Sequence, residues 1–355
     1  MILIKYLKHD LMIFFKFTVN TMKVYITFFL IVVNCFSINS QYTETINSNR
    51  PGLSHGAFSI GKNVLQFELG YKNSNYENSY YNNSKILENK ISYTIRYGFL
   101  NNKLEVFLDG SYNENKVTDN IKNNNYKNSF LGKQTLGFKF LVFDPFKNKK
   151  WHSVNLLSWK KNRNIKLTDF IPAFSVYTGL NYIPDKANSF DDPFSIFKKG
   201  SVFEINEKSV NSKVGLITQN HFLGKWVLVN NISLDRLGTS YSILNLITTL
   251  THNYKNPRWS SFLEFETFKN DIYSDNYYKF GTAYLFNNDL QIDSSFGFNS
   301  KKTPSNYYVS LGISTRFDWY EDELPVNRKE KKALKKERKK NTKKTKKDYK
   351  LIKKQ

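Results

Sequence analysis

The chain has 355 residues, a mean hydropathy of -0.53 and a formal net charge of +23. Its longest apolar run, Val24 to Val33, is too short for a membrane-spanning helix, which needs about 20 apolar residues. The charge is concentrated at one end, because the segment from Arg328 to Gln355 holds 16 Lys and Arg against 3 Asp and Glu. Basic residues interleaved with a recognition fold are therefore missing, and we expect no nucleic-acid partner.

Residues 1–40 are predicted to be a leader. The run from Val24 to Val33 matches the apolar region of a secretory signal peptide, with Met22 and Lys23 in front of it. We therefore predict a signal peptide over 22–40 and a start at Met22, with residues 1–21 upstream of the true start; the alternative is one long basic region before the apolar run. The only cysteine, Cys35, lies in this leader, so the mature chain would have no disulfide, thiolate metal site or cysteine nucleophile.

Residues 41–63 are predicted to be a periplasmic lead-in with an Arg50-Pro51-Gly52 turn. From Val64 onward the chain alternates apolar and polar residues with period 2, which is the signature of β-strands. In the first such segment Leu65, Phe67, Leu69 and Tyr71 share one face, and Gln66, Glu68 and Gly70 share the other.

An even number of strands is predicted. The segments are 64–71, 90–99, 104–112, 131–142, 169–181, 212–221, 226–234, 240–252, 259–268, 277–286, 290–299 and 307–319. Short connections follow most even-numbered segments, and long polar loops are expected at 72–87, 113–130 and 182–211. The short connection after 226–234 departs from this pattern, as does an insertion at 143–168 in which we expect a brief helix. Short turns at one end and long loops at the other are typical of outer-membrane barrels.

A soluble β-sandwich shows the same alternation, so strand length and aromatic placement must separate the two folds. The segments are long enough to cross a tilted bilayer span, and aromatic residues often end them, as interface girdles require. The last segment ends with Phe317 and Trp319 on its apolar face, a terminal signal suited to the barrel-assembly machinery. We predict an all-β fold: a single antiparallel transmembrane outer-membrane β-barrel of about 12 strands over 64–319, with both termini periplasmic.

The lead-in and first strand resemble the start of an outer-membrane transporter family that is named after a meta-cleavage (MetA) pathway of phenol degradation. Arg50-Pro51-Gly52 matches its Asp-Arg-Pro-Gly-like motif, with Asn49 where the family usually has Asp. The matching residues of the first strand are Gln66, Glu68, Gly70 and Tyr71, and 169–182 is similar to a mid-barrel strand of the family. The resemblance implies passage of a small molecule through the outer membrane, and the family name suggests a hydrophobic or aromatic solute.

Charged residues of both signs fall on the predicted inner face, where a narrow barrel would bring them together. These lumen-lining candidates are Glu68, Lys90, Arg96, Glu105, Asp109, Lys139, Glu264, Glu266, Asp293 and Arg316. They could line a permeation path and set its selectivity, or form a salt-bridged interior that neutralises buried charge, and the two roles do not exclude each other. The Arg50-Pro51-Gly52 motif likewise has two interpretations, a turn before the first strand, and a lumen plug or substrate contact.

No pattern indicates an enzyme. The four histidines outside the leader are His55, His152, His221 and His252, and none has a zinc-like spacing. Barrel hydrolases carry a serine two residues after a histidine, whereas Ala57, Val154, Leu223 and Tyr254 stand there in this chain. We expect no catalytic residue, metal or cofactor.

Residues 320–355 are predicted to be a disordered basic tail, because the segment is dense in like charge and poor in apolar residues. In the periplasm such a tail would be solvated or would contact anionic lipid or cell-wall polymers. The favoured function is that of a channel or transporter for a small solute through the outer-membrane bilayer. The alternative is a structural or adhesive barrel without transport activity.

Overall fold

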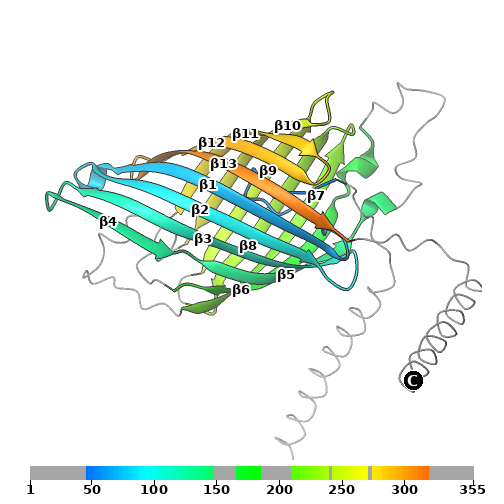
Figure 1. Cartoon of the computed structure of the whole chain (residues 1–355), viewed down its shortest axis with the longest axis horizontal. Helices are drawn as coiled ribbons and strands as arrows, with labels where there is room; N and C mark the ends of the chain where they lie inside the picture. Colours follow the sequence, from blue (N-terminus) through cyan, green and yellow to red (C-terminus); the bar gives the residue numbers. More distant parts are fainter. Residues whose placement is uncertain (1–44, 148–164, 185–208, 240–241, 271–273, 320–355) are drawn as a thin grey trace, which may run out of the picture. The chain divides into compact units, whose positions relative to one another are not determined.

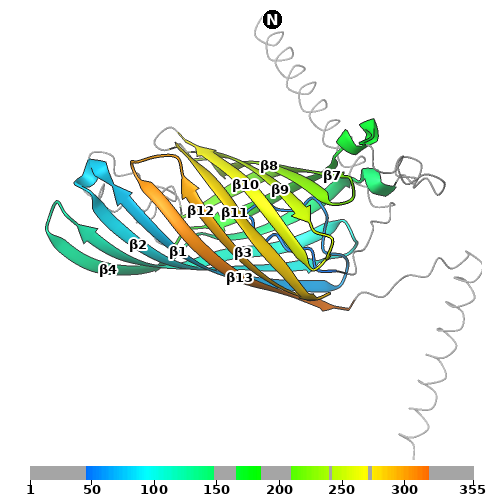
Figure 2. The same cartoon turned by 90° about the horizontal axis from the view of Figure 1, so that it is seen from above.

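The computed structural model describes residues 45–147, 165–184, 209–239, 242–270 and 274–319, which form a β-barrel (Figures 1 and 2). Its strands are β1 (Val64–Asn78), β2 (Ser84–Gly98), β3 (Leu104–Asp119), β4 (Asn124–Leu131), β5 (Gln134–Phe143), β6 (Ala173–Tyr182), β7 (Val210–Phe222), β8 (Trp226–Leu237), β9 (Ile243–Asn253), β10 (Trp259–Lys269), β11 (Ser274–Asn287), β12 (Leu290–Asn299) and β13 (Ser305–Asp318). Three short 3-10 helices accompany them: η2 (Ser79–Tyr81), η3 (Pro145–Lys147) and η4 (Leu167–Phe170). No helix in the described ranges is long and apolar enough to cross a membrane.

The strands close into a ring of antiparallel pairs, in which successive strands are neighbours except that β5 pairs with β3 and not with β4. β1 pairs with β2 on one side and with β13 on the other, so the first and last strands seal the barrel. β4 and β5 both pair with β3 and together make one interrupted stave. Because β4 and β5 share one position in the ring, the 13-stranded sheet is a twelve-stranded barrel, which confirms the predicted fold and strand number.

The barrel is apolar outside and charged inside. Outward residues such as Leu69, Leu136 and Leu263 are 50%, 52% and 63% exposed, whereas Arg96 and Glu105 are fully buried. A soluble sandwich would bury its leucines and expose its charges to water, because removing an unpaired charge from water costs several kcal/mol per ion. The apolar outer surface is suited to a lipid bilayer, and the alternation therefore resolves in favour of a membrane barrel.

The predicted loops at 72–87 and 113–130 are wrong. β1 and β2 continue through this region to a connection of only 79–83, and β3 and β4 leave only 120–123 unpaired. Asparagine is depleted in strands, which is why these Asn-rich segments read as loops. In the structure their amides bond along and across strands: Asn73 donates to Asn89 at 2.8 Å and Asn75 donates to the Tyr307 hydroxyl at 2.5 Å. The four strands β1–β4 therefore project beyond the rest of the wall at one end (Figure 1).

The opposite end of the barrel carries the short connections that the sequence predicts, at 99–103, 223–225, 254–258 and 288–289. We call it the short-turn end, and we call the end with the projecting strands the long-strand end. The connection between β8 and β9 is short, as the sequence indicated. The leader, the helix expected near residue 155, most of 182–211 and the basic tail lie outside the described residues.

Candidate functional site

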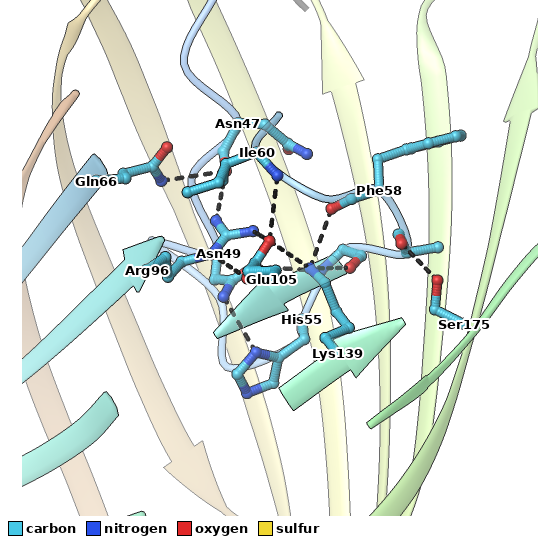
Figure 3. Close-up of polar contacts among 12 residues, drawn as sticks. Asn47, Asn49, His55, Phe58, Ile60, Gln66, Arg96, Glu105, Lys139 and Ser175 are labelled. Carbon is cyan, nitrogen blue, oxygen red and sulfur yellow. Dashed lines mark hydrogen bonds and ion pairs between the residues drawn. The ribbon is translucent and has the colours of Figure 1, made fainter. Parts of the chain in front are cut away.

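Residues 46–62, which we call the plug, fold as a loop into the barrel lumen instead of lying outside it (Figure 3). The segment enters at the short-turn end, where the Ile46 amide donates to the Asn288 carbonyl at 2.7 Å. It leaves at the same end, where the Asn63 amide donates to the Gly98 carbonyl at 3.0 Å. Between these points the plug contacts the wall mainly through side chains of the strands, so its position depends on inward-facing polar residues.

The second half of the plug is held by its backbone. Lys139 of β5 donates to the carbonyls of Gly56 and Phe58, both at 3.0 Å, and Ser175 of β6 donates to the Ala57 carbonyl at 2.5 Å. Figure 3 shows these groups converging on the segment from several strands. Unpaired backbone groups are costly to bury, so these contacts give an irregular segment the partners that a strand neighbour would supply.

A buried ionic network fixes both arms of the plug. Arg96 of β2 lies 2.7 Å from Glu105 and 3.2 Å from Glu68, and Lys139 lies 3.2 Å from Glu105. The same groups bind the plug, because Arg96 donates to the Asn47 carbonyl at 2.7 Å and Glu105 accepts from the Ile60 amide at 3.1 Å. Removing one charged side chain would leave another fully buried charge without its partner, so the network and the plug depend on each other.

The Arg-Pro-Gly motif lies inside the lumen. Arg50 forms a bidentate pair with Asp293 of β12, with Nε at 3.1 Å and a terminal nitrogen at 3.0 Å. Its guanidinium lies flat across Gly70 and Gly312, which face each other on β1 and β13, and a Cβ at either glycine would overlap it. The two glycines therefore form a notch for the Arg50 side chain. Gly70, which belongs to the family-like pattern of the first strand, is needed for close approach and not for a turn.

Glu264 of β10 holds the tip of the plug. Its carboxylate accepts from the Leu53 amide at 2.9 Å and from the Thr249 hydroxyl at 2.7 Å. A Cβ at Gly52 would come within 2.5 Å of a Glu264 oxygen, so glycine at this position lets the carboxylate reach the backbone. Arg50 and Gly52 thus each contact a different acidic residue of the wall, Asp293 and Glu264 respectively.

His55 lies at the boundary between the plug and the open part of the lumen. Its ring packs between Phe107 and Tyr177 at 5.4 and 5.5 Å, and its Nε2 lies 3.8 Å from Asp109. Burial lowers the pKa of His55 well below its usual value, and the nearby cations Lys213, Lys139 and Arg96 lower it further. Asn49 accepts from the Gly56 amide through Oδ1, which turns its Nδ2 toward His55 Nδ1 at 3.1 Å. This orientation suits a neutral ring that accepts at Nδ1.

A cavity of about 410 Å³ lies on the long-strand side of the plug. One wall carries apolar and aromatic residues from β9, β10, β11 and β13: Ile243, Ile247, Phe268, Tyr277 and Tyr308. The facing wall carries hydroxyl, amide and carboxylate groups from β2, β3 and β5: Ser92, Thr94, Asp109, Ser111, Asn113 and Thr135. Asn245, Glu266 and Lys279 also line it from β9, β10 and β11, so the aromatic wall carries polar groups as well. The cavity is large enough for a small organic molecule.

The ten sequence-derived candidates divide between these places. Glu68, Arg96, Glu105, Lys139, Glu264 and Asp293 contact the plug. Lys90, Asp109 and Glu266 line the cavity, as does Glu68. Arg316 lies at the short-turn end, where it pairs with Asp289 at 3.0 Å. A role of these residues in permeation stays a prediction, because their positions show proximity and not flow.

Several neutral plug contacts escaped the sequence reading. The His55 amide donates to Asn231 at 2.8 Å and the Ala57 amide donates to Gln219 at 2.9 Å. Both side chains lie on inward positions of β8 and β7, so the alternation along these strands could indicate them, although they carry no charge. In the described ranges, no group of three or more His, Cys, Asp and Glu side chains could hold a metal ion.

A closed ring of amphipathic strands with an apolar exterior and a polar, partly filled lumen defines a transmembrane β-barrel of the outer-membrane class. The family described as "Putative MetA-pathway of phenol degradation" matches residues 48–317, and the chain belongs to it. No curated protein sequence matches the chain.

Among solved structures, an outer-membrane channel from Pseudomonas putida F1 is similar at 10% identity and a TM-score of 0.44, over 77% of this chain and 100% of that one. The KdgM porin is similar at 9% identity and a TM-score of 0.40, over 71% and 99%. The CymD monoaromatic hydrocarbon channel is similar at 9% identity and a TM-score of 0.35, over 73% and 90%.

Proposed function

We propose that the protein is an outer-membrane channel for small molecules that the plug holds closed. The observation that supports this is the lumen itself, in which a cavity of about 410 Å³ ends on a segment held by side chains. The plug is anchored to the strands by bonds such as those from Arg50 and Glu264, which can break without opening the sheet. A solute in the cavity would cross when the plug moves.

The solute class proposed from the family membership is a small hydrophobic or aromatic molecule. The aromatic wall of the cavity supports it, since Phe268 and Tyr277 stack at 6.0 Å and Tyr277 lies 6.3 Å from Tyr308. Flat rings bind well against such surfaces. The charged and amide groups of the facing wall show that the cavity is not uniformly apolar.

The proposed location is the bacterial outer membrane, with the short-turn end and both termini in the periplasm. The described chain enters and leaves the barrel at the short-turn end, so a periplasmic location of the termini would place this end in the periplasm. Phe317 near the end of β13 is 48% exposed, which leaves it accessible to the barrel-assembly machinery as a terminal aromatic signal.

Cysteine staples can test whether the plug must move. The Ser54 and Thr249 hydroxyls lie 2.8 Å apart, as do those of Ser48 and Ser314, so each pair can be replaced by two cysteines that reach one another. Single-channel recording and uptake into liposomes would be compared in oxidised and reduced protein. We expect Ser54→Cys with Thr249→Cys to close the channel when oxidised and to restore wild-type flux when reduced.

The matched control staples the wall and not the plug. Asn230 and Thr248 face each other on β8 and β9 outside the cavity lining, with Thr248 Oγ1 3.0 Å from Asn230 Oδ1. Oxidising Asn230→Cys with Thr248→Cys should leave flux unchanged. Equal flux through oxidised and reduced plug staples, with the disulfide verified by mass spectrometry, would show that solute passes without plug movement.

The second candidate function, a structural or adhesive barrel, is favoured by the pairing of the buried charges at the plug. Arg96, Glu105 and Lys139 are all buried and all paired, which is what a permanently closed interior requires. The same recordings separate the two functions. Absence of flux in wild type and in both reduced staple variants would support the structural barrel.

A further inference from the structure

One patch of the cavity wall combines acceptor oxygens with aromatic rings. Asn245 on β9 and Glu266 on β10 lie near each other, and Asn245 Nδ2 donates to Glu266 Oε1 at 3.3 Å. That bond uses the amide nitrogen and turns Asn245 Oδ1 away from Glu266. This oxygen is buried, and it has no hydrogen-bond partner within the ranges that the structure describes. A buried carbonyl without a partner costs free energy, so a ligand donor that reached this oxygen would be favoured.

Glu266 also has capacity for a further donor. Two lysines that line the same cavity pair with other carboxylates: Lys279 lies 3.8 Å from Glu264, and Lys72 lies 3.4 Å from Glu88. Within the described residues, Glu266 forms no ion pair at 4 Å or less, and its one hydrogen bond comes from Asn245. A carboxylate accepts several hydrogen bonds, so Glu266 and Asn245 together can receive more than one donor from a ligand.

Three rings flank these acceptors. Tyr277 is the direct cross-strand partner of Glu266, and its ring stacks on Phe268 with planes 17° apart. Tyr308 lies 6.3 Å from Tyr277 and lines the same cavity. The patch therefore offers flat apolar surface next to strong acceptors.

We propose that this patch binds a small ring compound that carries hydroxyl groups, with the ring face against Phe268, Tyr277 and Tyr308 and the hydroxyls donating to Glu266 and Asn245. The ring can be aromatic, as in a benzenediol, or saturated, as in a monosaccharide, since both present a flat face and O–H donors. The proposal deepens the proposed function, because it names the solute class that occupies the cavity of the channel.

The chemistry disfavours the two neighbouring solute classes. A plain hydrocarbon would fill the space beside the rings but leave the Asn245 oxygen without a donor. A carboxylate would place its charge beside Glu266, where like charges repel. The site therefore discriminates by donor count, since unpaired buried acceptors reject analogues that lack the O–H group.

Ligand-observed NMR on the purified full-length protein in detergent measures this preference directly. The probes are benzene-1,2-diol, its dimethyl ether and glucose. We expect the diol to bind at least about 10-fold more tightly than the ether, which has the same ring but no donor. Stronger binding of the diol than of glucose would identify an aromatic solute, and the reverse would identify a sugar. Equal binding of diol and ether in wild-type protein, or no binding of either hydroxylated probe, would overturn the proposal.

Variants place the binding on the patch. Glu266→Gln and Asn245→Ala should each weaken binding of the preferred probe, Glu266→Gln by about 10-fold because the acceptor loses its charge. Glu114→Gln, a matched change on an outward position of β3, should bind like wild type. Unchanged affinity in both patch variants, with wild-type heat-modifiable mobility, would overturn the assignment. Binding does not require flux, so diol binding without conductance would overturn the channel and keep the site, and conductance without binding would do the opposite.

Discussion

The plug level and the cavity level of the lumen use the same residue types on the same strands, with opposite results. On β3, Glu105 is fully buried and lies within 3.2 Å of two cations, whereas Asp109 has a side chain that is 27% exposed and His55 3.8 Å away. On β10, Glu264 binds plug amides while Glu266, two residues on, lines the cavity. The difference comes from the plug backbone, which supplies partners to one level and not to the other. Stability should therefore depend on the first level and solute recognition on the second.

The largest effect is expected at the plug level. Glu105→Gln leaves Arg96 and Lys139 buried with Glu68 as their remaining nearby carboxylate, and we expect a loss of about 3–5 kcal/mol in the free energy of unfolding. Urea unfolding of the protein in lipid vesicles measures it. A loss below about 1 kcal/mol, the size typical of exposed pairs, would mean that this network is solvated and would remove the contrast between the levels.

The comparison also requires that the residues of both levels point into the lumen, and a residue between them that points outward can test this. Leu108 lies between Phe107 and Asp109 on β3 and faces the exterior. Leu108→Arg should destabilise the inserted barrel by roughly 2–4 kcal/mol if the position is near the middle of the bilayer. Ser92→Arg, on a cavity-lining position, is the control and should be mild. Equal costs at the two positions, measured by folding into vesicles, would mean that the faces are wrongly assigned.

The barrel could be predicted from the sequence because period-2 alternation reports directly on which face of a strand each residue occupies. The assignments of Glu105, Glu264 and Arg96 to the inner face follow from that alternation alone. The Asn-rich extensions of β1–β4 could not be predicted, because asparagine is unfavourable in isolated strands and is satisfied here by partners such as Tyr307 on other strands.

The division of the lumen into two levels was equally hidden. An alternating pattern shows that Glu264 and Glu266 share a face but contains nothing about a distant segment that binds only one of them. Arg50, Gly52 and Gly70 were visible as a motif, and their spacing suited a turn and a strand as well as a plug. Their shared role in holding the plug becomes visible only through the contact of Arg50 with Asp293, which lies 243 residues away in the sequence.

A pH dependence of intermediate size is expected at the boundary between the levels. The pKa of His55 is lowered in the folded protein, so its contribution to stability is complete above its unfolded value of about 6.5 and is lost as the pH falls toward the folded value. Lowering the pH from 7.5 to 5.5 should therefore lower the free energy of unfolding, because the unfolded chain takes up a proton on this histidine that the folded protein does not. The groups that face it are Asp109, Glu105, Lys213, Lys139 and Arg96.

His55→Asn isolates this contribution, since every other histidine of the chain is present in both proteins. The difference in melting temperature between pH 7.5 and 5.5 should be smaller in the variant than in wild type. An identical pH dependence in the two proteins would show that His55 titrates as freely as a histidine of the unfolded chain, and that the plug does not bury it.

The smallest effect on stability is expected at the cavity level, and it sharpens the comparison most. Glu266→Gln removes a carboxylate that forms no ion pair with a described residue, so the free energy of unfolding should change by less than about 0.5 kcal/mol. Lys and Arg already outnumber Asp and Glu among the cavity-lining residues, seven to five, so the variant should shift ion selectivity further toward anions. Reversal potentials in asymmetric salt measure that shift.

Glu264→Gln, at the next inward position of β10 toward the plug, should affect stability and not selectivity. It weakens the bonds to the plug amides and lowers the melting temperature, with little change in ion selectivity while the plug stays in place. If Glu266→Gln lowers the melting temperature as much as Glu264→Gln does, the cavity is part of the same structural network as the plug, and the lumen has one level and not two.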